Sequence, residues 1–304
     1  MPKKSKQGSE KKDFLTSTEI LLDSAGRILK KTGASAIMVY VDLLPSIDAL
    51  ECLPEGVHVI LVTRQKQNEI ENIPGVRTTI SVPAYSFTRM DQIKLASVIG
   101  LTRGVIESGH KIVCLTGIAG SGKLDTLMVL DLAGEFEIFS GHAGELLTED
   151  VFAEVLIRAI DLSVRMSHEG REGKPVGTCF ILGDNESVIS YSRQMTLNPF
   201  RGYEEEERNI LSPELEETVK EFASIDGAYI VRGDGVIITA AAYLQPPGGE
   251  KPLEPGLGAR HAAASALTEA TEALAIVLSE STGTVRLYKK GMVVMAVERP
   301  TGHI

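Results

Sequence analysis

The chain has 304 residues, of which 43% are hydrophobic and 24% charged, as is usual for a globular protein of one or two domains. Its formal net charge of −10 argues against a protein that binds duplex nucleic acid, because such proteins usually present a basic face. No apolar run approaches the roughly 18 residues that a membrane helix needs, so no association with a membrane is expected.

The first twelve residues are rich in lysine and have no apolar stretch behind them. They fit a disordered basic tail (1–12) better than a signal peptide. The three cysteines, Cys52, Cys114 and Cys179, are far apart and match neither a zinc site nor a disulfide framework. We therefore expect free thiols in a reducing cytoplasm.

Residues 13–147 alternate between helical and strand-like patterns, which predicts an α/β domain with crossover helices. The first helix is expected to be capped by Ser17 or Thr18, to run to Lys31 and to end at Gly33. The further elements expected in this part are strands at 36–40, 57–62 and 111–115, a helix at 91–107, and short strands at 127–130 and 136–139.

A glycine-rich segment, Gly117 to Lys123, follows the strand at 111–115 and fits the pattern of a phosphate-binding P-loop. A working P-loop continues with Ser or Thr and then with a helix, whereas here Leu124 follows and the next segment is strand-like. A glycine loop between two strands is the alternative, and a P-loop ATPase that uses Lys123 stays a minor hypothesis.

The stretch 109–117, the glycine loop and the run 126–130 together resemble the C-terminal domain of pyruvate kinase. This resemblance covers roughly residues 13–147 and implies an α/β sandwich with a mostly parallel sheet. It also implies a regulatory or assembly role for this part of the chain rather than chemistry.

Residues 148–304 show a second alternation of helices and strands, for which we expect a mixed-sheet α/β domain. A helix capped by Thr148 is expected to bury Phe152, Val155 and Leu156, and the acidic run 204–207 to be solvent-exposed. The other elements expected here are strands at 176–182, 228–231, 236–242, 274–278 and 284–288, and helices at 213–222 and 261–274.

Residues with the chemistry for a metal-bound nucleotide are spread over this second part. Asp226 directly precedes Gly227, so a ligand could approach the backbone there, and its carboxylate could bind a divalent cation or poise a hydroxyl. Arg260 and His261 begin an alanine-rich helix, where phosphate binds readily, and Glu280 could supply a second metal oxygen. Each of these residues also suits an ordinary turn or a solvent-facing position, so spacing alone leaves the site open.

Four motifs in order resemble the diadenylate cyclase domain, the catalytic domain of the DNA-integrity scanning protein and its relatives. The motifs are the segments 226–228, 240–244, 258–263 and 279–283. With the pyruvate-kinase-like front part, the whole chain resembles the archaeal type of this enzyme.

The resemblance implies that two ATP molecules condense to cyclic di-AMP with release of two pyrophosphates, in a homodimer whose two protomers face each other. Asp226, Arg260 and His261 would be catalytic, and Mn²⁺ or Mg²⁺ would be held by Asp226 and Glu280. The nucleotide-binding residues implied are Gly227, Ala228, Tyr243, Leu244, Gly258 and Ser279. The front domain could assemble such dimers into a larger homo-oligomer.

The chain departs from the family motif at Ala259 and Ala262, where relatives usually carry Thr and Arg, and at Ile225, where many carry His. Candidates to replace the lost triphosphate contacts are Arg193, Arg201 and Lys289. The departures keep open a second hypothesis, in which the protein is a sensor that binds adenine nucleotides without turnover.

Overall fold

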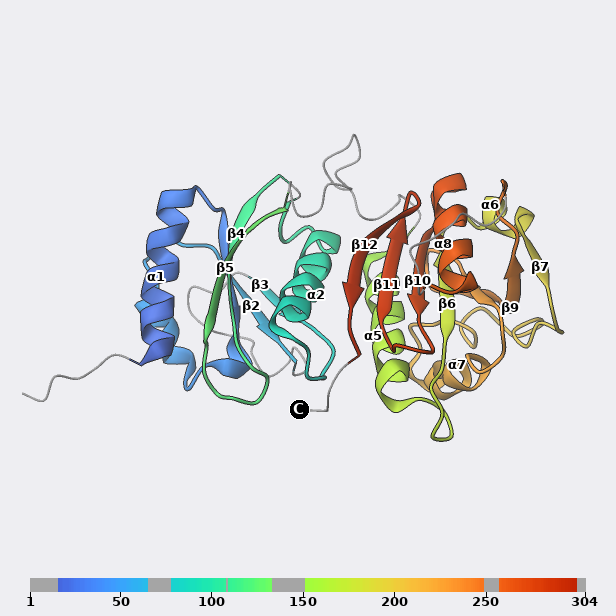
Figure 1. Ribbon diagram of the computed structural model, residues 1–304, viewed down its shortest axis with the longest axis horizontal. Helices are drawn as coiled ribbons and strands as arrows, with labels where there is room; N and C mark the ends of the chain where they lie inside the picture. Colours follow the sequence, from blue (N-terminus) through green and yellow to red (C-terminus); the bar gives the residue numbers. More distant parts are fainter. Residues whose placement is uncertain (1–15, 65–77, 108, 133–150, 249–256, 300–304) are drawn as a thin grey trace, which may run out of the picture.

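The computed structural model describes residues 16–64, 78–107, 109–132, 151–248 and 257–299, and it contains two β-sheets that follow one another along the chain (Figure 1). The expected basic tail, the cap at Thr148, the strand at 136–139 and the expected boundary between residues 147 and 148 all lie outside these residues.

The first sheet has five strands in the order β3-β2-β1-β4-β5. Its strands are β1 (Ala36–Tyr40), β2 (Val59–Thr63), β3 (Thr78–Ser81), β4 (Lys111–Thr116) and β5 (Thr126–Asp131). The first four are parallel and β5 is antiparallel to β4, so the expectation of a mostly parallel sheet is confirmed. Every residue of β1 and β2 is buried, because helices cover both faces of a parallel sheet.

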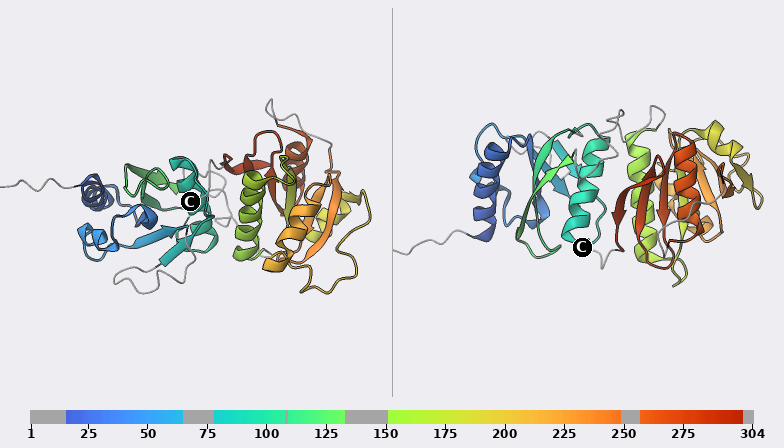
Figure 2. Two further views of the ribbon diagram at one scale, coloured as in Figure 1. Left: turned by 90° about the horizontal axis from the view of Figure 1, so that it is seen from below. Right: turned by 45° about the horizontal axis from the view of Figure 1, so that its top comes forward.

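Two helices, α1 (Ser17–Thr32) and α2 (Arg89–Thr102), lie on opposite sides of this sheet (Figures 1 and 2). The N-cap of α1 is Thr16, which forms a capping box with Glu19, so the predicted caps at Ser17 and Thr18 were wrong by one or two positions. The predicted end at Gly33 is confirmed, with a left-handed φ of 70°. Helix α2 is shorter than predicted, because a turn after Thr102 replaces its last helical residues.

The glycine-rich segment 117–123 connects β4 directly to the antiparallel strand β5. The phosphate-binding mode of a P-loop depends on the N-terminus of the helix that follows it. A strand follows here, which favours the structural alternative for this segment.

The second sheet has seven strands in the order β12-β11-β10-β6-β8-β9-β7. They are β6 (Thr178–Leu182), β7 (Ser192–Gln194), β8 (Ala228–Val231), β9 (Ile237–Leu244), β10 (Leu274–Leu278), β11 (Val285–Lys289) and β12 (Met292–Val297). Among the described strands of this sheet, only β6 and β8 pair in parallel, and the expected mixed sheet is therefore confirmed.

Helices cover both faces of the second sheet. Helix α5 (Ala153–Glu169) packs on one face, together with α7 (Glu216–Phe222), and α8 (Ala259–Ala270) packs on the other. A short helix, α6 (Asn185–Ser190), leads into the edge strand β7. Two predictions need correction: Phe152 is the N-cap of α5 and half exposed instead of buried, and α8 spans 259–270 instead of 261–274.

The two sheets are joined by a contact between α2 and β12, visible at the centre of Figure 1. Beside it, the buried hydroxyl of Tyr85 donates a hydrogen bond to Glu169 at 2.9 Å, and the Tyr85 ring lies 5.0 Å from the ring of His168. Within the part of the chain that the structure describes, no helix is both long and apolar enough to cross a membrane.

Candidate active site

Asp226 and Gly227 form the tight entry to strand β8. Gly227 has a φ of 115°, which only glycine adopts readily, and a Cβ there would lie 2.7 Å from the backbone of Ala241 on β9. The close approach of the two strands leaves the Asp226 side chain at the sheet edge, 71% exposed. The sequence predicted that a ligand could approach the backbone at Gly227, whereas the structure shows that the backbone of β9 takes up this space.

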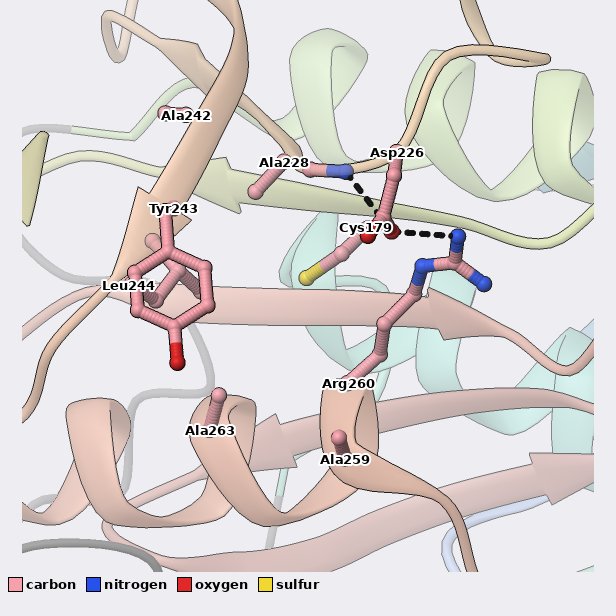
Figure 3. Close-up of a pocket in the computed structure, with 10 residues that line it drawn as sticks. Cys179, Asp226, Ala228, Ala242, Tyr243, Leu244, Ala259, Arg260 and Ala263 are labelled. Atoms are coloured by element: carbon pink, nitrogen blue, oxygen red, sulfur yellow. Dashed lines mark hydrogen bonds and ion pairs between the residues drawn. The ribbon is translucent and has the colours of Figure 1, made fainter. Parts of the chain in front are cut away.

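Arg260, in the first turn of α8, connects the two expected metal carboxylates. Its Nη2 donates to Asp226 Oδ1 at 2.7 Å, and its Nη1 lies 3.7 Å from Glu280 Oε2 (Figure 3 shows the first contact). The guanidinium fits because residue 177 is glycine: a Cβ there would lie 2.8 Å from Arg260 Nη1. Gly177, Asp226 and Glu280, which are far apart in sequence, thus surround the guanidinium of Arg260.

His261 is buried beneath the same helix start. Its Nδ1 lies 3.0 Å from the hydroxyl of Tyr288, and its Nε2 has no hydrogen-bond partner among the described residues. Burial, and then the nearby charges of Arg286 and Arg260, lower the pKa of His261 to about 4. The sequence suggested a cationic pair at residues 260 and 261, whereas the structure gives one cation and one neutral imidazole.

Two pockets meet at Asp226, Ala259 and Arg260. The first is mainly apolar, with a cavity volume of about 90 Å³. It is lined, besides those three, by Cys179, Gly227, Ala228, Ala242, Tyr243, Leu244 and Ala263 (Figure 3). The second is more polar and is lined, besides the same three, by Pro175, Gly258, His261, Val277, Leu278, Ser279, Glu280 and Ser281.

All residues predicted for the site therefore border one of these two adjoining pockets. Ala242 and Ala263, which line the apolar pocket, lie in the predicted motifs but were given no role, and sequence reasoning missed Cys179, in the same pocket, and Gly177, which makes room for Arg260. Small residues that contribute to a site only by leaving space for a ligand or a side chain carry no functional group that a sequence pattern could reveal. The one usable signal was the glycine just before the apolar strand at 178–182.

The three cations proposed to replace the lost motif contacts lie elsewhere. The Arg193 guanidinium lies 5.3 Å above the Tyr243 ring, at the apolar end of the site. Arg201 is exposed and, like Lys289, borders neither pocket. Lys289 is buried, and its side chain projects from the face of β11 opposite to the one that carries Tyr288.

Asp226 and Glu280 fit a divalent cation that is shared with a bound phosphate. Both carboxylates are largely exposed, at 71% and 62%, and both lie close enough to contact the same guanidinium. No cluster of three or more His, Cys, Asp or Glu side chains suited to a metal occurs within the described ranges. A hard cation such as Mg²⁺ often takes one or two carboxylates and completes its shell with substrate phosphates and water.

Comparison with known proteins agrees with this geometry. Residues 165–293 match the family described as "DisA bacterial checkpoint controller nucleotide-binding", and residues 18–139 match the one described as "Probable sensor domain DacZ_P". The diadenylate cyclase of Methanocaldococcus jannaschii is 34% identical over 202 residues, which cover 66% of this chain and 64% of that relative. The diadenylate cyclase of Haloferax volcanii is 31% identical over 234 residues, which cover 75% of this chain and 82% of that relative. A solved structure of DacA from Staphylococcus aureus is 23% identical, with a TM-score of 0.33, over 46% of this chain and 84% of that one.

Proposed function

The chain belongs to the diadenylate cyclase family, and from that premise we propose how its two pockets make cyclic di-AMP from ATP. Two ATP molecules condense, each 3′-oxygen forms a bond to the α-phosphorus of the other, and two pyrophosphates leave. The observation that carries the proposal is the junction of an apolar and a polar pocket at Asp226 and Arg260. A nucleotide has the same division into an apolar base and a charged phosphate chain.

The apolar pocket holds adenine. Its walls are Tyr243 and Leu244 on one side and Ala263 of α8 on the other, and Ala228 and Ala242 leave space for a planar ring (Figure 3). The triphosphate then extends along the start of α8, where the helix N-terminus favours negative charge. Ser279 and His261 border the polar pocket, and the Ser279 hydroxyl can contact phosphate oxygens.

Asp226 orients the 3′-hydroxyl and accepts its proton as the new bond forms. Arg260 releases part of its contact with Asp226 and stabilises the negative charge that develops on the phosphate oxygens. Asp226 and Glu280 together would hold Mn²⁺ or Mg²⁺, which when bound neutralises phosphate charge. The described chain supplies these groups without rearrangement of the sheet.

The reaction needs a second protomer, because a hydroxyl and an α-phosphate from two different nucleotides must face each other. An isologous homodimer provides this arrangement, and the high exposure of Asp226 and Glu280 supports a site that opens toward a partner. Removal of the front domain tests its role in assembly. A smaller oligomer for residues 148–304 alone, measured by gel filtration with light scattering, would support assembly through that domain, and an unchanged size would contradict it. We place the enzyme in the cytoplasm, where ATP is available and its free cysteines stay reduced.

A product assay tests the function directly. The full chain is incubated with ATP and Mn²⁺, and the products are separated by chromatography. Formation of cyclic di-AMP is expected, and binding of ATP without product would instead favour the non-catalytic sensor. ATP consumption that survives Lys123→Ala but not Asp226→Asn would also exclude ATP use by the glycine loop.

A further inference from the structure

The polar pocket is short of positive charge for the ligand that the proposed function assigns to it. Its described lining contains two carboxylates, Asp226 and Glu280, and one cation, Arg260, which already contacts both. His261 is neutral near pH 7 because its pKa is low. A triphosphate carries several negative charges, and even with one divalent cation the pocket would hold excess negative charge.

Arg286 on β11 lies on the side of the sheet that faces this pocket. It is paired with Val277 of β10, which lines the polar pocket, and directly paired residues project from the same face of a sheet. Tyr288, two residues along, shares that face and contacts His261. Arg286 is therefore next to the buried imidazole, which agrees with its effect on the charge state of His261.

The Arg286 side chain is available for a ligand. It is half-buried and has no hydrogen bond or ion pair to any other residue that the structure describes. Beside it, His261 borders the polar pocket; its side chain is 4% exposed, and its buried Nε2 has no hydrogen-bond partner among the described residues. A half-buried guanidinium and an unsatisfied ring nitrogen in one place both call for an oxygen-rich anion.

We propose that Arg286 is a phosphate-binding residue of this site, which together with His261 contacts the triphosphate and replaces the arginine that the family motif places at Ala262. The inference rests on the proposed function for the identity of the ligand. The positive charge comes from strand β11, next to the pocket-lining Val277, instead of from helix α8.

The test measures binding of inorganic tripolyphosphate to the full chain by calorimetry, without divalent metal, for the wild type, Arg286→Gln and Arg286→Lys. We expect the Kd for tripolyphosphate to rise about tenfold in Arg286→Gln, the effect of one charge-assisted contact, and about threefold in Arg286→Lys, which keeps the charge but loses the planar fork. The Kd for adenosine is expected to stay unchanged in both variants.

Arg27→Gln is the matched control, because it removes the charge of a largely exposed arginine on α1, beside the first sheet, and its Kd values should stay within twofold of wild type. A Kd for tripolyphosphate in either folded Arg286 variant that equals the wild-type value would overturn the proposal. The two proposals fail separately: a wild type that binds tripolyphosphate through Arg286 but makes no cyclic di-AMP contradicts the function alone. A wild type that makes cyclic di-AMP, with Arg286 variants of normal affinity, contradicts this inference alone.

Discussion

Asp226, Arg260 and Glu280 show how the same side chains serve the free and the proposed bound state. Without a nucleotide, the Arg260 guanidinium contacts both carboxylates and limits their mutual repulsion. All three side chains are at least partly exposed, so these ion pairs contribute little to stability. They can therefore be exchanged for metal and phosphate contacts at low cost.

Replacing Asp226 by Asn should remove the group that orients and deprotonates the 3′-hydroxyl. We expect the rate of cyclic di-AMP formation to fall at least 100-fold, with the free energy of unfolding changed by less than about 0.5 kcal/mol, because the side chain is 71% exposed. Asp23→Asn, at an exposed surface aspartate of α1, is the control and should keep full activity. Near-normal turnover in Asp226→Asn would show that another group performs this step.

His261 should make the stability of the protein depend on pH. Its pKa is about 4 in the folded protein and near 6.5 when unfolded, so the unfolded chain binds the additional proton between these values. Stability conferred by the neutral form is therefore present above pH 6.5 and lost as the pH falls toward 4. Between pH 7 and pH 5 we expect this residue to cost about 2 kcal/mol of unfolding free energy.

Urea unfolding of wild type and His261→Gln at both pH values isolates this effect, since other titrating groups contribute equally to both proteins. The variant should lose clearly less stability than wild type on acidification. Equal losses in the two proteins would mean that the His261 imidazole titrates normally in the folded state.

The hairpin of β8 and β9 holds Asp226, the proposed catalytic aspartate, through an irregular pairing. The register shifts between Ala228 and Ile230, and Ala241 on the facing strand has a positive φ of 55°. Gly227 lies against this irregular point, which brings the two backbones together where Asp226 begins the strand. The position of Asp226 thus depends on the shape of the hairpin as well as on its own contacts.

Gly227→Ala should therefore damage both the fold and the site. A Cβ at residue 227 would lie 2.7 Å from the Ala241 backbone, and the φ of 115° is unfavourable for alanine. We expect a loss of at least about 2 kcal/mol in unfolding free energy, and loss of activity even at temperatures where the variant is folded.

Gly33→Ala is the control that separates the effect of the positive φ from the effect of the steric clash with the neighbouring strand. Gly33 also has a positive φ, of 70°, but a Cβ there meets nothing within 4 Å. This control should lose only about 1 kcal/mol and keep its activity, because the backbone preference alone is affected. Equal losses in the two variants, measured by urea unfolding, would contradict the role of the close strand approach.

The contact between the two sheets runs through a buried polar network. The Tyr85 hydroxyl donates to Glu169 at the end of α5, and Glu169 accepts from Lys220 of α7 at 2.8 Å. Lys220 is itself buried and also pairs with Glu216 at 2.9 Å. Because α7 ends four residues before Asp226, the network links the front sheet to the element that precedes the proposed catalytic residue.

Removing the Tyr85 hydroxyl should weaken this link. Tyr85→Phe keeps the buried ring but leaves one Glu169 oxygen without its donor, so we expect a loss of about 1 kcal/mol and a thermal midpoint lower by about 2–4 °C. Tyr203→Phe is the control, since that ring is 58% exposed, and it should leave the midpoint unchanged. An unchanged midpoint in Tyr85→Phe would show that the α2 and β12 packing alone joins the sheets.

The amino-acid sequence was enough to predict the buried strands and the order of the chemical groups. Continuous apolar runs predicted β1, β4, β6 and β10, because a strand that is buried on both faces is apolar at nearly every position. It did not predict β3, β7 or β12, which lie at or near sheet edges and have partly exposed residues that weaken the signal.

The local motifs likewise pointed to Asp226, Arg260 and Glu280, whose charge and spacing are visible along the chain. Two properties of the site depend on strand register and burial instead: the neutral state of His261 and the place of Arg286 beside it. Desolvation and the direction in which a side chain projects arise only when distant segments pack together. No single stretch of the chain contains that information, because each of these contacts joins residues that the chain itself keeps far apart.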